Sequence, residues 1–369
     1  MGLVKPNRKR EHKMDQDKRI LSAKEHWAGR MVTNGVPLAD FNDVTSSVKS
    51  WKDWCKKWSE KGDIHRNLAK LAISENRNIS AAEHFKTASI CYHFGKFLFV
   101  DYPAEMKEAH LKSIECYNQA LPLMNPPGER LLIPYNGKHL CGNLRLPVSR
   151  LEKPAIVILI LGLDSTKEEM YSYESVFLDR GLATFSFDGP GQGEGEYDFF
   201  MCPEYEKPVK SVISTLQKLP QINSDKIGLW GVSMGGYYAP RAAAFCDEIR
   251  ACISLSGPYD LSLCFKNLPE LTASAVEYRS GSKTSAELEH FVKRMSLKHV
   301  AKKITCPLYI VSGELDRVVP PQHSEMLEKA AINSEEVIHQ KVPNGGHVAN
   351  NVAYTYRYNC ADWMLEKLS

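Results

Sequence analysis

The sequence predicts an α/β protein with a doubly wound, mostly parallel sheet, preceded by an N-terminal all-helical domain. Two observations support this fold class. From residue 155 onward, short apolar runs such as "AIVILILGL" alternate with helical stretches such as "SYESVFLDRG". Continuous apolar runs of this length are typical of strands buried on both faces of a parallel sheet. Before residue 130, by contrast, apolar residues recur with helical spacing and no strand pattern is evident.

Length, charge and cysteine usage restrict the function classes. The 369 residues leave room for one large domain and an accessory domain. The formal net charge is only +3, which gives no argument for a nucleic-acid or anionic membrane partner, and no apolar run reaches the length of a membrane span. The ten cysteines are scattered without CxxC or His-rich spacing. This usage disfavours zinc sites and disulfide frameworks, so we expect a cytoplasmic protein without a metal.

The N-terminal third is expected to contain a tail and a helical domain. Residues 1–19 are basic and polar and lack an apolar core, which predicts a disordered tail and not a signal peptide. Residues 20–127 are predicted to form the helical domain. Its helices are expected near residues 46–72, 81–99 and 105–124. The last two resemble a helical repeat pair, but a repeat array needs about three units or more. Trp51, Trp54 and Trp58 share one stripe, which indicates packing between helices.

Residues 128–369 are predicted to form the second domain. Alternating apolar residues around Asn136-Gly137 indicate a β-hairpin at its start, because Asn-Gly is a preferred two-residue turn. The apolar runs predict strands within residues 155–163, 183–193, 226–231, 249–257, 306–316 and 335–342. Helical stretches between them lie at residues 172–181, 205–219 and 237–245. A helical insertion is expected at about residues 260–300.

Ser233 is predicted to be a nucleophile. The pattern Gly231-Val232-Ser233-Met234-Gly235 fits a strand-to-helix turn so sharp that the serine takes a strained backbone conformation and exposes its hydroxyl. The flanking glycines avoid the collisions that side chains would make in such a turn. Three fixed positions are a weak signal alone, and a plain structural turn is the alternative. The apolar run before the pattern and the helix formers after it favour the nucleophile.

Asp316 and His347 are the expected partners of Ser233. In a fold of this kind the acid follows a late strand, and the histidine follows the acid in a loop. Asp316 comes just after the apolar run "LYIVSG", and His347 lies in the later loop "PNGGHVANN". A serine hydroxyl needs a neutral imidazole to take its proton, and a buried carboxylate orients that imidazole. Glu314 and Asp260 also follow strands and are the rival acids.

Stabilising the negatively charged intermediate requires two backbone donors. They are expected to be the N–H of Met234, directly after the nucleophile, and the N–H of Leu163, in the loop after the strand at residues 155–163. Asp164 lies in the same loop, where an ionised carboxylate would oppose the charge that develops. It is interpreted either as the N-cap of a following helix or as a protonated acid that binds a substrate hydroxyl or carbonyl and transfers a proton.

Three stretches, "LGLDSTKEEMYSYE", "FDGPGQGEG" and "GVSMGG", carry a family resemblance together with the helical N-terminal region. They resemble the α/β-hydrolase group that contains 2,6-dihydropseudooxynicotine hydrolase, the FrsA-type proteins and the polyketide-shortening hydrolases of fungal melanin and bacterial anthraquinone pathways. The resemblance covers roughly residues 20–369. It implies an α/β-hydrolase fold, an N-terminal helical lid, a homodimer, and hydrolysis of a carbon-carbon bond flanked by carbonyls. The resemblance also implies that the nucleophile, acid and base of this group correspond to Ser233, Asp316 and His347.

Asp164 stands where the nicotine-degrading member of that group has glutamate, which favours the polyketide-shortening branch. We therefore expect a serine hydrolase that cleaves a β-dicarbonyl small molecule in a retro-Claisen reaction, without a cofactor, and so shortens an aromatic polyketide in secondary metabolism. Asp164 is expected to hold the second carbonyl, and Tyr237 is a candidate for substrate binding. The alternatives are a carboxylesterase, a catabolic hydrolase of an aryl diketone resembling 2,6-dihydropseudooxynicotine, and a binding module on a degenerate core. The complete set of serine, aspartate and histidine argues against the binding module.

Overall fold

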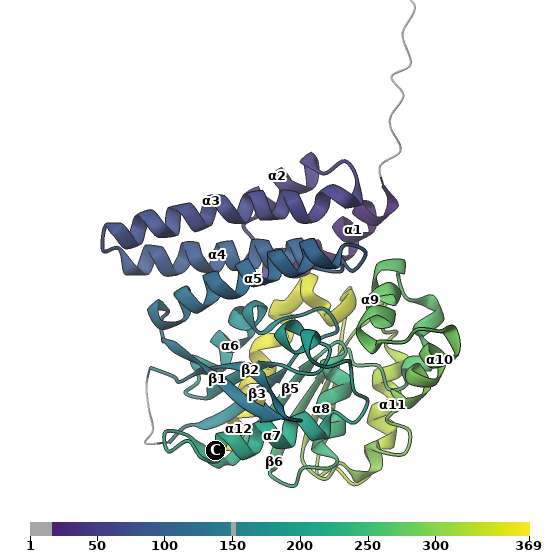
Figure 1. The fold of residues 1–369 in the computed structure, drawn as a ribbon. Coiled ribbons are helices and arrows are strands. Elements are labelled where there is room, and N and C mark those ends of the chain that lie inside the picture. The colour runs from purple at the N-terminus through teal and green to yellow at the C-terminus, as the bar shows by residue number, and fades with distance from the viewer. Residues whose placement is uncertain (1–16, 149–152) are drawn as a thin grey trace, which may run out of the picture.

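The N-terminal helices lie across one end of the sheet-containing part of the chain (Figure 1). The structure is a computed structural model and describes residues 17–148 and 153–369. The N-terminal helices are α1 (Lys18–Thr33), α2 (Leu38–Ser47), α3 (Trp54–Ser74), α4 (Asn78–Lys96) and α5 (Pro103–Ala120). The tail expected at residues 1–19 falls mainly outside the described residues, although Lys18 and Arg19 belong to α1.

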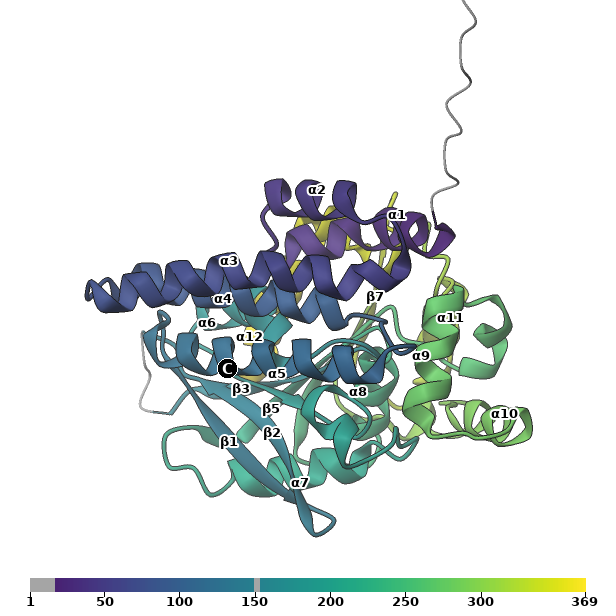
Figure 2. The same cartoon turned by 45° about the horizontal axis from the view of Figure 1, so that its top comes forward.

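Aromatic packing joins the N-terminal helices. Helices α3 and α4 run side by side, and α5 lies next to them on the side of the sheet (Figures 1 and 2). Trp51, Trp54 and Trp58 are completely buried. The rings of Trp51 and Trp54 stack with centroids 5.1 Å apart, and the Trp54 indole N–H donates to the Phe94 carbonyl at 2.8 Å. The tryptophan stripe therefore packs helices together, as its spacing predicts.

An eight-stranded sheet forms the centre of the second part. Its strands are β1 (Gly128–Tyr135), β2 (Lys138–Arg145), β3 (Ala155–Ile160), β4 (Ala183–Asp188), β5 (Asn223–Val232), β6 (Ile249–Leu255), β7 (Leu308–Gly313) and β8 (Val337–Val342). They lie in the order β1-β2-β4-β3-β5-β6-β7-β8, and all pairs are parallel except β1 with β2 and β2 with β4. The predicted doubly wound, mostly parallel sheet is confirmed. The predicted hairpin joins β1 to β2 through Asn136 and Gly137, whose φ angles of 45° and 77° suit a type I′ turn.

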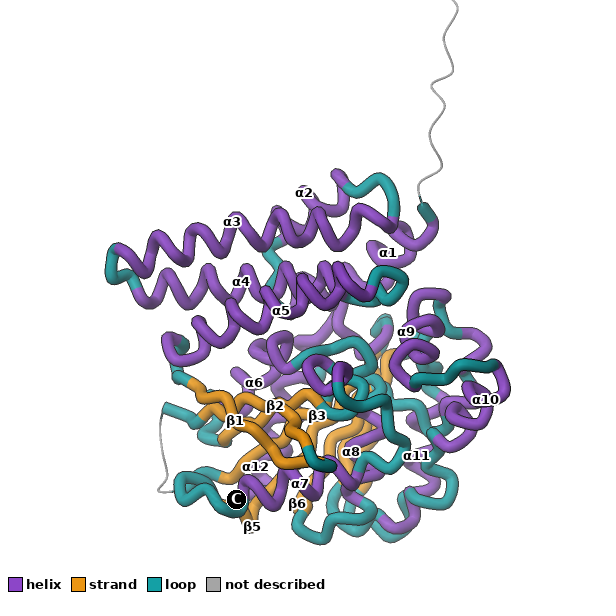
Figure 3. The backbone as a smooth tube through the Cα atoms, in the orientation of Figure 1, coloured by secondary structure: helices purple, strands orange, loops and turns teal. Residues whose placement is uncertain are grey.

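Helices cover both faces of this sheet (Figure 3). They are α6 (Tyr171–Leu178), α7 (Glu206–Leu216), α8 (Gly235–Ala243), α9 (Glu270–Ser280), α10 (Ser285–Arg294), α11 (Gln322–Ala330) and α12 (Arg357–Leu368). Successive residues of β3 belong to different apolar clusters: Ile158 and Ile160 to one, Val157 and Leu159 to the other. Side chains alternate across a strand, so β3 is buried on both faces, which explains its uninterrupted apolar sequence.

The loops that follow the carboxyl ends of the parallel strands gather beneath α1. Among them are two short 3-10 segments, η3 (Lys167–Met170) after β3 and η8 (His347–Thr355) after β8, and α1 packs against η8. Helices α9 and α10 occupy the region of the expected insertion. Across residues 17–148 and 153–369, no helix has both the length and the apolar character needed to cross a membrane.

Candidate active site

Ser233 occupies a sharp turn between β5 and α8. Its φ is 55°, a left-handed conformation that non-glycine residues rarely adopt. A Cβ on Gly231 would come within 2.0 Å of the Gly235 carbonyl oxygen, and one on Gly235 within 2.1 Å of the Ile160 oxygen. Both flanking glycines are therefore required by close backbone approach. The turn is held by the Ser233 N–H, which donates to the Leu255 carbonyl at 2.8 Å.

The structure brings Ser233, His347 and Asp316 into one hydrogen-bonded chain. Ser233 Oγ lies 2.8 Å from His347 Nε2, and His347 Nδ1 lies 2.8 Å from Asp316 Oδ2. The other Asp316 oxygen accepts the backbone N–H groups of Val318 and Val319, both at 2.9 Å. With the Nδ1 proton directed at Asp316, Nε2 of a neutral imidazole is free to accept the serine proton. This is the geometry that a nucleophilic serine needs.

The two rival acids, Asp260 and Glu314, form hydrogen bonds with groups other than His347. Asp260 accepts from the Ser262 N–H at 2.9 Å at the start of a short helix, and from Ser296 Oγ at 2.9 Å. Glu314 accepts from the Asn344 N–H at 3.3 Å. Neither side chain bonds to His347 in the described part of the chain, so Asp316 alone takes the orienting position.

His347 begins a backbone segment with unusual dihedrals. Val348 and Ala349, the next two residues, have φ angles of 61° and 48°. A β-branched valine in the left-handed region is strained, and surrounding packing must impose the conformation. Part of that packing comes from α1, because the Trp27 ring meets the His347 ring edge-on with centroids 5.9 Å apart. The N-terminal helices thus contact the histidine directly.

The loop between β3 and η3 passes beside Ser233. A Cβ on Gly162 would lie 3.3 Å from the Ser233 Cβ. The N–H groups of Leu163 and Met234 donate to no acceptor within residues 17–148 and 153–369. Two unpaired backbone donors near the serine suit the role predicted for them, which is to stabilise an oxyanion.

Asp164 is paired with an arginine from α1. Arg30 NH1 lies 3.0 Å from Asp164 Oδ1, and both side chains are about nine-tenths buried. This cation compensates the carboxylate charge beside the proposed oxyanion site. Thr166, and not Asp164, precedes η3, so the capping interpretation is wrong. In the ion pair Asp164 serves as an acceptor, which favours a binding role over proton donation.

Arg30, Glu169 and His93 belong to this site and were not predicted from the sequence. Arg30 forms a bidentate pair with Glu169, with Nε–Oε1 and NH2–Oε2 distances of 2.6 Å, and His93 Nε2 lies 3.2 Å from Glu169. Burial disfavours the Glu169 charge, but the Arg30 cation dominates and holds the pKa of this carboxyl well below its usual range. Glu169 falls in the quoted "STKEE" motif, whereas no local pattern marks Arg30 or His93.

Lys167, the lysine nearest to Asp164 in sequence, belongs to a separate buried network. Its ammonium lies 2.8 Å from Asp188, 2.6 Å from Glu194 and 2.5 Å from Glu168. Burial raises the pKa of Asp188 against the attraction of Lys167. Glu168, Asp188 and His110 have potential metal-ligand atoms within 4.8 Å of one another. The Lys167 ammonium already compensates these carboxylates.

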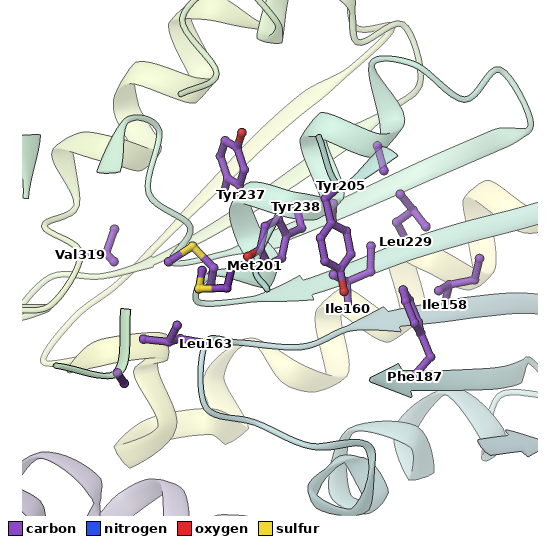
Figure 4. Close-up of a cluster of buried hydrophobic side chains, with 14 of the residues drawn as sticks. Ile158, Ile160, Leu163, Phe187, Met201, Tyr205, Leu229, Tyr237, Tyr238 and Val319 are labelled. Carbon is purple, nitrogen blue, oxygen red and sulfur yellow. The ribbon is translucent and has the colours of Figure 1, made fainter. Parts of the chain in front are cut away.

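Tyr237 lies in an apolar cluster and not on a cavity wall. Its side chain is fully buried, and its hydroxyl donates to the Pro203 carbonyl at 3.0 Å. It lies on α8, and Figure 4 shows it in the cluster that also contains Met201, Tyr238 and Val319. Neither cavity beside His347 is lined by it.

Two cavities meet at His347. A small one of about 20 Å³, close to the space of a single water molecule, lies between α1 and Ser233. An open cleft of about 320 Å³ lies on the other side, between α1 and the loops that carry Asp316 and His347. Arg30, His347 and Asn350 line both cavities and form the wall between them.

Comparison with known proteins gives consistent results. A profile of the prolyl oligopeptidase family matches residues 170–369. The chain is 32% identical over 346 residues to 2,6-dihydropseudooxynicotine hydrolase of Paenarthrobacter nicotinovorans, covering 93% of this chain and 92% of that protein. It is 30% identical over 224 residues to the hydrolyase poxO of Penicillium oxalicum, covering 57% of this chain and 53% of that one.

Solved structures are also similar to this chain. The crystal structure of the 2,6-dihydroxy-pseudo-oxynicotine hydrolase superposes with a TM-score of 0.84 at 30% identity, covering 92% of this chain and 95% of that one. The structure of AbyA5 gives a TM-score of 0.68 at 16% identity, covering 90% of this chain and 94% of that one, and shows similarity of fold.

Proposed function

Because the chain belongs to the prolyl oligopeptidase family of α/β-hydrolases, we propose that it is a serine hydrolase that cleaves a carbon-carbon bond of a β-dicarbonyl substrate. Ser233 is the nucleophile, His347 the base and Asp316 the orienting acid. The observation that carries the assignment of the nucleophile is the hydrogen-bonded chain of these three side chains, with 2.8 Å at both links. The carbon-carbon chemistry rests on the similarity to 2,6-dihydropseudooxynicotine hydrolase over nearly the whole chain.

The reaction proceeds through an acyl-enzyme. His347 Nε2 takes the Ser233 proton as Oγ attacks a ketone carbon, and the oxyanion accepts the N–H groups of Met234 and Leu163. Collapse of this intermediate breaks the bond to the neighbouring carbon. The electron pair of the broken bond stays on that carbon, so the leaving fragment is an enolate, and the enolate takes the proton from the His347 imidazolium. Water, deprotonated by His347, then attacks the ester and releases a carboxylic acid and Ser233.

An enolate leaves readily only if the second carbonyl is held. Arg30 is the group best placed to do this, because it lines both cavities beside His347 and its ion pairs with Asp164 and Glu169 fix its direction. Asp164 remains part of the proposed substrate-binding site as the partner of Arg30. The rings of Trp27 and Tyr173 line the small cavity beside Ser233 and suit an aryl ketone or an aromatic polyketide. At about 20 Å³ this cavity holds a single water molecule, so such a substrate enters it only when α1 moves away from Ser233.

A β-diketone and an activated ester distinguish this proposal from a carboxylesterase. Incubation with 1-phenyl-1,3-butanedione is expected to yield a ketone and a carboxylic acid in equal amounts, measured by liquid chromatography. Ser233→Ala is the control and should yield neither product. Turnover of p-nitrophenyl butyrate without any cleavage of the diketone would favour the carboxylesterase. Cleavage of a pyridyl diketone in preference to polyketide-like substrates would favour the catabolic alternative.

The lid, the oligomeric state and the location are proposed with the same function. Helices α1–α5 form the lid, since α1 supplies Trp27 and Arg30 to the site. Ile64, Leu68 and Leu71 are spaced along one face of α3, and each is more than 40% exposed. Such a stripe supports a homodimer, which light scattering would detect. Cysteines that are unpaired throughout the described residues support a cytoplasmic location.

A further inference from the structure

We propose that Gln192 is a positioning residue that aims the Leu163 N–H at the oxyanion. The inference rests on the proposed function, because it presumes that Ser233 generates an oxyanion beside Leu163. Gln192 lies in the glycine-rich loop after β4, within the "FDGPGQG" motif, and is only 1% exposed. The reaction described above does not use it. A glutamine this deeply buried must have partners for its amide, and these partners show its role.

Gln192 binds two backbone carbonyls at the start of the loop that carries Leu163. Its Nε2 donates to the Leu161 carbonyl and to the Gly162 carbonyl, both at 2.7 Å. In a trans peptide the N–H points opposite to the carbonyl of the preceding residue. With the Gly162 carbonyl directed at Gln192, the Leu163 N–H points away from Gln192. That N–H has no acceptor within the described residues, and Gly162 lies next to Ser233.

Tyr205 prevents the Gln192 amide from turning over. Its hydroxyl donates to Gln192 Oε1 at 2.6 Å, so Oε1 must face Tyr205 and Nε2 must face the two carbonyls. The Tyr205 ring is itself clamped, because it stacks on Tyr238 of α8 with centroids 3.8 Å apart (Figure 4). A Cβ on Gly189 would come within 1.9 Å of the Tyr205 hydroxyl. The first glycine of the motif therefore makes room for the hydroxyl that orients Gln192.

A second side chain fixes the other peptide of Leu163. Arg279 of α9 is fully buried and donates from NH1 to the Leu163 carbonyl. Its charge is compensated by Glu196, whose Oε2 lies 3.2 Å from Arg279 NH2 and 3.3 Å from Lys96 of α4. Both peptides that flank Leu163 are thus held by side chains from separate segments, Gln192 from the loop after β4 and Arg279 from α9. A donor fixed before the reaction stabilises an oxyanion without paying for reorganisation.

The variant Gln192→Met tests the proposal, because methionine has similar length and cannot donate to the carbonyls. On p-nitrophenyl butyrate we expect kcat per active site to fall about 10- to 100-fold with KM nearly unchanged. Active sites are counted with a fluorophosphonate, so unfolded protein does not enter the rate. The inhibition constant of an alkyl trifluoromethyl ketone, which forms a charged adduct on the serine, should rise by the same factor. Gln217→Met is the matched control, because Gln217 is exposed and directly follows the last residue of α7.

Tyr205→Phe provides a second, milder variant that keeps the two carbonyl bonds and removes the orienting hydroxyl. We expect a smaller loss of kcat than in Gln192→Met, with KM and the count of active sites again unchanged. A wild-type kcat per titrated site in Gln192→Met would overturn the positioning role, as would a rise in KM alone. These outcomes do not depend on the natural substrate: a failure of diketone cleavage with intact ester kinetics refutes the carbon-carbon proposal and leaves Gln192 in its role.

Discussion

Arg30 of α1 and Glu169 of η3 form a buried bidentate ion pair, with 2.6 Å between both pairs of atoms. The two residues are 139 positions apart in the sequence. Through this pair the N-terminal helices are tied to the loop that carries Leu163 and Asp164. Arg30 also packs against the Phe97 ring, with its guanidinium carbon 4.8 Å from the ring centroid. The contact between the N-terminal helices and this loop, and the charge balance of the site, therefore both involve the Arg30 side chain.

Arg30→Met should destabilise the protein by about 3 to 5 kcal/mol, because it leaves the Glu169 carboxylate buried without its cation. Chemical denaturation monitored by tryptophan fluorescence would measure the loss. The double variant Arg30→Met with Glu169→Met should recover part of it, since the Glu169 charge is gone and only Asp164 is left without its cation. Lys293→Met, which breaks the exposed pair with Glu289, is the control and should unfold like the wild type. Additive losses in the double variant would show that the pair is not coupled.

Ser233→Ala should abolish turnover and leave the fold intact, because the turn accepts a small residue. Loss of all three members of the hydrogen-bonded chain should cost little more than loss of Ser233 alone, since the three act as a unit. Steady-state kinetics on p-nitrophenyl butyrate and circular dichroism would check both statements. A variant that retains more than about a thousandth of wild-type kcat would refute the nucleophile.

Asp164→Asn should separate carbon-carbon cleavage from ester hydrolysis. The substitution keeps the side-chain volume and an oxygen for Arg30, but it removes one of the two carboxylate charges that hold the arginine. If this pair holds the second carbonyl while the enolate forms, diketone cleavage should fall by about 10²- to 10³-fold, as when one group that stabilises developing charge is removed. A p-nitrophenyl ester has a good leaving group and should be hydrolysed nearly as before. Both substrates are measured on one preparation. Equal losses on both would mean that Asp164 only maintains the conformation of the loop that carries Leu163.

Acid should weaken the fold partly through Glu194. Burial opposes its ionisation, but Lys167 and Arg130 outweigh this and lower its pKa to about 2. A depressed folded-state pKa contributes stability that is present above the unfolded value of about 4.3 and is lost as pH falls towards 2. Glu194→Gln should therefore flatten the decline of unfolding free energy between about pH 4.5 and 2.5, by about 2 kcal/mol after allowance for partial exposure. Parallel wild-type and variant curves would contradict this.

A chain that begins at Glu129 should be insoluble or inactive. Removing α1–α5 would uncover apolar surface and take Trp27 and Arg30 away from His347. Expression of this fragment and an ester assay would test the statement. A soluble fragment with wild-type kcat would show that the helices are an independent domain and not a lid.

Much of the fold was determined locally and could be predicted from the sequence. Continuous apolar runs marked β3 and β5, because strands buried on both faces need apolar residues at every position. The Asn136-Gly137 turn and the glycines around Ser233 were predictable for the same kind of reason, since each depends on the conformation of a few adjacent residues. Asp316 and His347 could be predicted as partners of Ser233 because their chain order and their place after late strands follow from the fold, and the structure places both in one hydrogen-bonded chain with it.

The tertiary structure alone decided what surrounds Ser233. Nothing near Arg30 in the sequence marks it as the partner of Asp164 and Glu169, because ion pairs between distant segments leave no periodic pattern. Tyr237 illustrates the reverse: it was a candidate for substrate binding in the sequence, whereas its ring packs edge-on against Tyr238 and its hydroxyl donates to the Pro203 carbonyl. The role of Gln192 likewise emerges only when the loops after β3 and β4 come together. Local sequence selects backbone conformation through short-range sterics, but the charges and donors that face a reacting atom are set by contacts between distant segments, which exist only after the chain has folded.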